Sequence, residues 1–288
     1  MSETLTPGDE LDGPAGADVR ALDSAAQHLR TPSGNGHMVW RSWGHGDPLV
    51  LLHGGYGSWA HWLRNIVPLS QRYRVIAADL PGLGDSDMPD DATSERVIDI
   101  VTAGLRTVTR GQRCHLVGFS FGSLVGGGVA AACGDELRSF TMVGGGPLFT
   151  PRRPRLELQR VVRGMGSDEI AAIQRTNLSL LMLHNRTSID ATAVAIQTRN
   201  TRVAQMKSIG FFPPDWLNSQ LPRVTAPLGA IWGEFDATAY PELDQREQAL
   251  RSLRPDAPFR MIPDVGHWVQ YEAAAAFNEA LLERLSSV

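Results

Sequence analysis

The chain has 288 residues, of which 42% are apolar and 20% charged, an ordinary composition for a soluble globular protein. Its net charge of −4 provides no basic field that would attract nucleic acid. No apolar run approaches the ~18 residues that cross a bilayer, and the polar, acidic start is unlike a signal peptide. Cys114 and Cys133 lie in apolar stretches, which favours reduced core thiols. We therefore expect a cytoplasmic protein without nucleic-acid or membrane partners.

Short apolar runs alternate with longer helical segments along most of the chain. The expected strands are residues 37–43, 49–52, 74–79, 114–119, 139–144, 228–233 and 259–262. Helix-length segments lie near 58–70, 94–109, 120–133, 241–253 and 270–286. Strands this apolar are typical of a parallel sheet that is covered on both faces. The alternation therefore predicts a doubly wound α/β domain.

Two segments depart from this alternation. Residues 1–22 are rich in Pro, Gly, Asp and Glu without apolar periodicity, so we expect a disordered or loosely packed N-terminal extension. Residues 148–222 contain no convincing strand, while Leu158, Val161 and Val162 recur at helical spacing, which predicts a helical lid. The core of the domain then comprises residues 23–147 and 223–288.

The sequence GFSFG at residues 118–122 joins an apolar strand to a helix-compatible segment. Its two glycines permit a tight turn that holds Ser120 in a strained conformation, with its hydroxyl presented above the sheet. The helix N-terminus behind the turn favours developing negative charge. A plain serine–glycine turn has the same letters, but the position between a buried strand and a helix favours a nucleophile.

A serine nucleophile needs a base, and the base needs an acid that orients it. Asp236 follows the apolar run LGAIWG, and His267 follows the next expected strand, just before the last helix. The order Ser, Asp, His is the order expected of an α/β-hydrolase. Asp264 is a competing acid, but it lies only three residues before His267, where a short turn would not aim its carboxylate at the ring.

A Gly-rich turn, HGGYGSW, follows the run LVLL and supplies the third element. The amide of Gly55 can point at a carbonyl oxygen together with the amide of Phe121, which forms an oxyanion hole. We interpret His53 as a structural residue of this turn, and DLPGLGDSD at 79–87 as scaffold behind it rather than a metal site. The candidate pocket walls are the aromatic residues Phe119, Trp268, Phe211 and Phe212.

The segments HGG, DLPGLGDSD, GFSFG, GEFD and VGHW, in this order, resemble the α/β-hydrolase superfamily from about residue 30 to the C-terminus. The resemblance implies a mostly parallel eight-stranded sheet, a lid after the sixth strand and the triad Ser120, Asp236 and His267. No cofactor and no metal are expected. We expect a serine hydrolase that cleaves a carboxylic ester, or a related acyl bond, of a small apolar or aromatic substrate through an acyl-enzyme.

Several alternatives stay open. The closing GHWVQYE is also similar to carbon–carbon bond hydrolases of aromatic ring-fission products, although these tend to carry an HGxGPG-type loop and a GNSMGG elbow. Perhydrolase or non-heme haloperoxidase activity and a non-catalytic ligand-binding module are further alternatives. The arginine run at 152–163 is expected to be a solvated helix face, with a place at the active-site mouth as the alternative. The oligomeric state is open, a homo-oligomer included.

Overall fold

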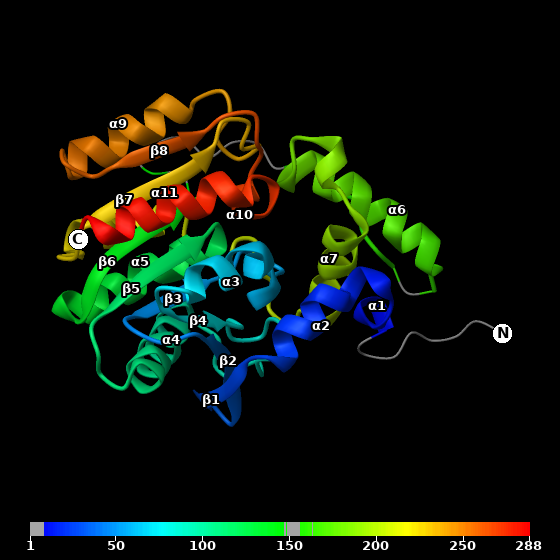
Figure 1. The fold of residues 1–288 in the computed structure, drawn as a ribbon, viewed down its shortest axis with the longest axis horizontal. Coiled ribbons are helices and arrows are strands. Elements are labelled where there is room, and N and C mark those ends of the chain that lie inside the picture. The colour runs from blue at the N-terminus through cyan, green and yellow to red at the C-terminus, as the bar shows by residue number, and fades with distance from the viewer. Residues whose placement is uncertain (1–8, 147, 149–155, 163) are drawn as a thin grey trace.

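The computed structural model describes residues 9–146, 148, 156–162 and 164–288 (Figure 1). Its centre is an eight-stranded sheet with the order β1-β2-β4-β3-β5-β6-β7-β8. The strands are β1 (Gln27–Ser33), β2 (Gly36–Trp43), β3 (Pro48–Leu52), β4 (Arg74–Ala78), β5 (Cys114–Phe119), β6 (Leu137–Val143), β7 (Leu228–Gly233) and β8 (Phe259–Ile262). Only β2 runs antiparallel to its neighbours β1 and β4, and the described strands from β4 to β8 pair in parallel. The predicted α/β class with a mostly parallel sheet is confirmed.

Helices cover both faces of the sheet, as the continuous apolar strands require. One hydrophobic cluster lies under α4 (Ser94–Thr109), α5 (Phe121–Cys133) and α9 (Leu243–Leu253). The other lies under the turn η2 (Trp59–Trp62) and the helices α3 (Leu63–Ser70), α10 (Val269–Glu272) and α11 (Ala274–Ser286). Figure 1 shows α3 and α11 side by side on this second face. No described helix is long and apolar enough to span a membrane.

The N-terminal segment is more ordered than its composition indicates. It forms α1 (Asp9–Asp12), a short turn η1 (Pro14–Gly16) and α2 (Ala17–Ser24). Val19 is buried, and the Trp43 indole donates a hydrogen bond to the carbonyl of Leu22 over 2.9 Å. Arg202 pairs with Glu10 at 2.5 Å. The expected loose packing therefore does not hold for residues 9–22, because partners far along the chain hold them, while residues 1–8 lie outside the described part.

The segment between β6 and β7, residues 148–222, is called the insertion below. Where it is described it contains helices and no strand: α6 (Ser167–Asn177), the π-helical turn η4 (Leu178–Met182), the turn η5 (Arg186–Ser188), α7 (Ala191–Val203), α8 (Trp216–Gln220) and the turn η6, which begins at Leu221. Figure 1 shows α6 and α7 beyond one end of the sheet. Phe212 and Leu217 are buried in the same cluster as α5, so part of the insertion belongs to the core.

One helix expected in the insertion is absent. Residues 156–162 are irregular, and Val162 is 55% exposed. A short helix is marginal without a buried apolar face, and this segment has none. Of the arginine run at 152–163, only Arg160 lies in the described part, and it is exposed. The predictions for Arg152, Arg153, Arg155 and Arg163 lie outside the described residues.

Candidate active site

Ser120 lies at the carboxyl end of β5, and α5 begins at the next residue. Its φ of 51° and ψ of −113° form a conformation that L residues rarely adopt. The glycines on either side make this turn feasible. A Cβ at Gly118 would lie 2.3 Å from the carbonyl oxygen of Gly122, and one at Gly122 would lie 2.4 Å from that of Leu52. Only glycine fits these two positions, so the sequence GFSFG folds into the strained elbow that was expected.

The structure brings the three predicted triad residues together. Nε2 of His267 lies 2.9 Å from Oγ of Ser120, and Nδ1 lies 2.8 Å from Oδ2 of Asp236. Asp236 is fully buried, and its Oδ1 accepts hydrogen bonds from the amide and the hydroxyl of Thr238 at 2.8 and 2.7 Å. Because the carboxylate is held on both oxygens, it fixes the proton of His267 on Nδ1. Nε2 is then free to accept the serine proton.

Asp264 makes other contacts. Its amide donates to the carboxylate of Glu234 at 3.0 Å, and its carbonyl accepts a hydrogen bond from the side chain of Asn185 at 2.6 Å. None of the contacts described for Asp264 reaches His267. The geometry therefore agrees with the choice of Asp236 as the orienting acid.

The turn after β3 lies directly against the nucleophile. A Cβ at Gly54 would lie 3.4 Å from Cβ of Ser120 and 2.9 Å from the ring of Phe119. Gly55 follows in this turn, and Phe121 is the first residue of α5, where backbone amides have no acceptor within the helix. The two predicted oxyanion donors therefore belong to the two segments that border Ser120, as acyl transfer requires.

Two buried histidines hold this turn. Nε2 of His53 accepts a hydrogen bond from the amide of Leu80 at 2.9 Å, and its Nδ1 donates to the carbonyl of Gly54 at 2.7 Å. Nδ1 of His61 accepts a hydrogen bond from the amide of Gly54 at 3.2 Å. Burial lowers the pKa of His53, and burial together with His53 and His267 lowers the pKa of His61 well below its ordinary value. Both rings are neutral structural groups, as expected for His53.

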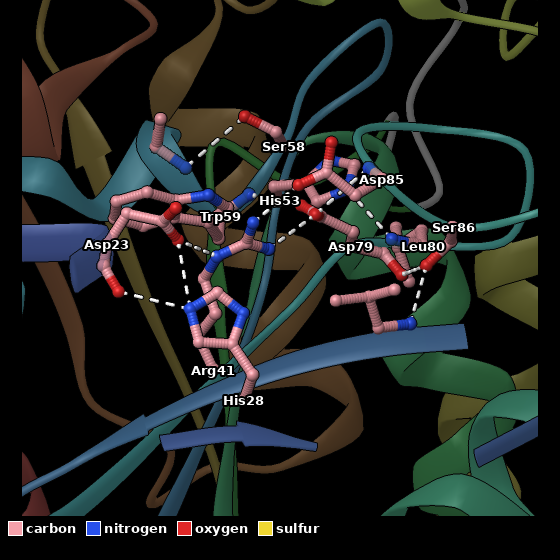
Figure 2. Close-up of polar contacts among 12 residues, drawn as sticks. Asp23, His28, Arg41, His53, Ser58, Trp59, Asp79, Leu80, Asp85 and Ser86 are labelled. Carbon is pink, nitrogen blue, oxygen red and sulfur yellow. Dashed lines mark hydrogen bonds and ion pairs between the residues drawn. The ribbon is translucent and has the colours of Figure 1, made fainter. Parts of the chain in front are cut away.

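A buried ion cluster centred on Arg41 supports the same turn (Figure 2). Nη1 of Arg41 donates to Asp79 at 2.8 Å, while its other nitrogens pair with Asp23 and Asp85. Burial opposes the charge of Arg41, but these carboxylates raise its pKa above the ordinary value. Asp79, fully buried, also accepts a hydrogen bond from the amide of Trp59 at 2.8 Å. The loop that begins at Asp79 thus has the expected scaffold role.

The aromatic residues next to the triad are core residues. Phe119 is fully buried, and its ring centroid lies 4.9 Å from that of His267. Trp268 is also fully buried, stacks on Tyr271 at 4.2 Å and donates its indole N–H to the carbonyl of His61 at 2.9 Å. Phe119 therefore packs directly on the imidazole of His267, while the bond to His61 anchors Trp268 and with it the backbone that follows His267. Neither side chain has exposed surface with which to line a pocket, although both were expected as pocket walls.

The insertion reaches the Gly-rich turn after β3, residues 53–58, which is called the oxyanion turn below after its predicted role. The rings of Phe211 and Phe212 lie 6.1 and 5.5 Å from that of Phe121, measured between centroids. A Cβ at Gly55 would lie 2.6 Å from Oγ of Ser208. Residues 208–212 therefore border the two residues predicted as oxyanion donors.

Three residues that support the site were not singled out in the sequence. Arg41 is the only charged residue within the apolar run HMVWRSW, and that isolated charge is a usable signal for a buried ion pair. Glu272 belongs to GHWVQYE, but its partners are backbone amides, which leave no trace in side-chain pattern. Ser208 has no local signal, since its contact is with a distant glycine.

These features define the class: an α/β protein with the Ser–His–Asp geometry of a serine hydrolase. The sequence agrees, because the model of the alpha/beta hydrolase family matches residues 49–280. The chain belongs to the alpha/beta hydrolase family.

Known sequences similar to this chain include hydrolases of ring-fission products. The 2-hydroxy-6-oxononadienedioate/2-hydroxy-6-oxononatrienedioate hydrolase of Paraburkholderia phymatum is 29% identical, over 83% of this chain and 87% of that protein. The 2-hydroxy-6-oxo-6-(2'-aminophenyl)hexa-2,4-dienoic acid hydrolase of Metapseudomonas resinovorans is 28% identical, over 84% and 85%. These names match the carbon–carbon alternative rather than the ester reading.

Solved structures with the same fold include enzymes that are named for different reactions. A meta-cleavage product hydrolase from Pseudomonas fluorescens IP01 has a TM-score of 0.72 at 20% identity, and the match covers 90% of this chain and 97% of that hydrolase. Naproxen esterase from Bacillus subtilis has a TM-score of 0.73 at 17% identity, with 94% and 98% covered. The fold is therefore shared by both kinds of hydrolase and does not decide the bond that is cleaved.

Proposed function

We propose that this protein is a triad-dependent serine hydrolase that cleaves the carbon–carbon bond beside the 6-oxo group of a 2-hydroxy-6-oxo dienoic acid. The observation that carries the hydrolase is the hydrogen-bonded chain from Ser120 through His267 to Asp236, at 2.9 and 2.8 Å. The choice of bond draws on the names of the sequence relatives, which specify such acids.

The chemistry of such a substrate sets the order of steps. The 2-hydroxyl proton leaves and C5 gains one, which gives a 2,6-dioxo acid with a C3–C4 double bond. Ser120 then attacks C6 while His267 takes its proton, and the amides of Gly55 and Phe121 hold the oxyanion. When the C5–C6 bond breaks, the electron pair delocalises onto the 2-oxo group as a dienolate, which His267 protonates. Water, with His267 as base, then releases the C6 acid from Ser120.

Ester hydrolysis is the second candidate, and one observation favours it. The residue before the nucleophile is Phe119, fully buried against His267, where ring-fission hydrolases tend to have the polar residue of GNSMGG. An ester needs no proton transfer to carbon before attack, because its leaving group is an oxygen atom that the protonated His267 can protonate directly. An apolar neighbour is therefore compatible with ester chemistry and offers no polar group for ketonisation.

Two parallel assays decide between the candidates. The first follows the loss of dienolate absorbance with 2-hydroxy-6-oxo acids that differ at C6, and the second follows p-nitrophenyl esters of increasing acyl length. A higher kcat/KM for the ring-fission acids supports the proposal, and a higher value for the esters replaces it with the second candidate. Ser120→Ala should abolish both activities. If the wild-type serine is not labelled by a fluorophosphonate, the non-catalytic module is the correct reading.

A further inference from the structure

We propose that Glu272 is a positioning residue that ties the insertion to the loop carrying His267, so that the catalytic base is in place only while the insertion is seated. Glu272 ends α10, beyond His267 in the chain, and contacts neither Ser120 nor the imidazole in the described hydrogen bonds. It acts through the backbone on either side of its carboxylate.

The carboxylate of Glu272 accepts hydrogen bonds from three backbone amides, which belong to two segments far apart in the chain. Oε2 of Glu272 accepts hydrogen bonds from the amide of Gly266 at 2.7 Å and from that of His184 at 3.1 Å. Oε1 accepts one from the amide of Asn185 at 2.6 Å. Gly266 directly precedes His267, whereas the other two donors belong to the insertion. Hydrogen bonds to an ionised acceptor are about twice as strong as neutral ones.

Two further bonds join the same segments. The amide of Trp268 donates to the carbonyl of Met182 at 2.7 Å, and the side chain of Asn185 donates to the carbonyl of Asp264 at 2.6 Å. Met182 ends the π-helical turn η4, where a carbonyl has no partner further along the helix. The residue after His267 is thus bonded to the insertion directly, and the residue before it is joined to the insertion through the carboxylate of Glu272.

The insertion also touches the loop of the triad acid. The ring of His184 stacks on that of Phe235 with centroids 4.1 Å apart and planes at 12°. Phe235 directly precedes Asp236. Residues 182–185 therefore contact the loops of both His267 and Asp236, and a shift of the insertion would displace the base from Ser120. A misplacement of about 1 Å in an active site costs about 10²-fold in rate.

Glu272→Gln is the variant that tests this role most directly, because glutamine has the same shape as glutamate but only one acceptor oxygen and no charge. Its NH₂ group would oppose the amide of Asn185 if it took the place of Oε1, or the amides of His184 and Gly266 if it took the place of Oε2. Glu279→Gln is the matched control, since Glu279 is exposed on the neighbouring helix α11 and loses the same charge. Asn185→Ala is a second, milder variant that removes only the side-chain bond to Asp264.

The first readout is the rate at which a small fluorophosphonate labels Ser120 in the folded, full-length protein. We expect labelling of Glu272→Gln to be about 10- to 100-fold slower and that of Glu279→Gln to match the wild type. The inference rests on the triad of the proposed function but not on the choice of substrate. A wild type that is not labelled contradicts the proposed function, whereas a labelled wild type with an equally reactive Glu272→Gln variant contradicts the positioning role.

The second readout is amide hydrogen exchange. If Glu272 acted only on its own loop, exchange would change in that loop and not in the insertion. Peptides covering residues 182–190 and 262–270 should both exchange faster in Glu272→Gln, while those of β3 stay protected. Asn185→Ala should show the same pattern with a smaller change, and it serves in place of Glu272→Gln if that variant does not fold. Faster exchange in residues 262–270 alone, with the insertion unchanged, would overturn the coupling.

Discussion

Ser208 of the insertion lies directly against Gly55 of the oxyanion turn. A Cβ built on Gly55 would be 3.2 Å from Cβ of Ser208, a tight contact, and 2.6 Å from its Oγ, which is closer than Cβ atoms approach. Ser208 is itself buried, so it has little room to move away. The close fit makes the position of the oxyanion turn dependent on the insertion.

This contact predicts that Gly55→Ala loses most of its activity unless space is made for its methyl group. The added carbon must displace the turn or Ser208, and a shift of the Gly55 amide weakens the oxyanion hole, where loss of one donor costs about 10²- to 10³-fold in kcat. Steady-state kinetics of Gly55→Ala should show a fall of this order in kcat.

The double variant Gly55→Ala/Ser208→Gly is the control for the clash. It removes both the Oγ and the Cβ that the methyl group would meet, so most of the lost kcat should return. If Ser208→Gly restores nothing, the loss in Gly55→Ala has another origin than this contact.

A second prediction concerns the buried ion cluster. Asp79→Asn keeps an oxygen for the amide of Trp59 but removes the fully buried charge that faces Arg41. Breaking a buried pair by removal of one charge costs about 3–5 kcal/mol. We expect the free energy of unfolding in urea to fall by about this amount, with slower labelling of Ser120.

Asp85→Asn is the comparison, because Asp85 pairs with the same Arg41, and also with Arg199, but its side chain is 36% exposed. Solvent screens that pair, so the loss of stability should be smaller than for Asp79→Asn. Equal losses in the two variants would show that burial of Asp79 does not set the strength of the cluster.

The triad could be predicted because each member depends on a local pattern. Ser120, Asp236 and His267 each follow an apolar strand, and the carboxyl ends of parallel strands meet at one edge of the sheet. The expected strands at 114–119 and 228–233 agree with β5 and β7 to the residue for the same reason. A run of apolar residues between two turns can be recognised as a buried strand without knowledge of its distant partners.

What the sequence did not reveal depends on partners far along the chain. The edge strand β1 has the sequence QHLRTPS, in which only Thr31 and Ser33 are buried, so its pairing with β2 is what makes it a strand. The N-terminal helices are held by Arg41 and Arg202, which follow them by many residues. Glu272 likewise binds backbone amides, whose arrangement exists only in the folded chain.

Buried histidines predict that stability falls in mild acid. His115 in β5 is buried and shares a 2.8 Å hydrogen bond with Ser139. Burial, aided by the charge of Arg138, lowers its pKa to about 4, whereas an unfolded histidine titrates near about 6.5. Between these two pKa values the unfolded chain binds more protons than the folded protein, so the unfolded fraction rises as the pH falls. The contribution of His115 is complete above about pH 6.5 and is lost progressively toward about pH 4.

Urea unfolding at about pH 7 and about pH 5 measures this effect. The free energy of unfolding should decrease by up to about 1.4 kcal/mol per pH unit from His115 once the pH is below the unfolded pKa. His53 and His61, whose pKa values are also lowered by burial, act in the same direction. His115→Gln should lose less stability between the two pH values than the wild type. The same dependence in both proteins would contradict the role of His115.

The orienting role of Asp236 gives the last prediction. In Asp236→Asn, the amide oxygen can still accept the two bonds from Thr238, which leaves the amide NH₂ facing Nδ1 of His267. Nδ1 must then accept a hydrogen bond, so the ring proton moves to Nε2, and Nε2 no longer accepts the proton of Ser120. The variant should keep its fold and its urea midpoint while kcat falls by about 10⁴-fold, as expected for the wrong tautomer. Circular dichroism and the urea curve test the fold, and single-turnover kinetics test the chemical step. Near-wild-type turnover in a folded Asp236→Asn protein would mean that another group orients His267.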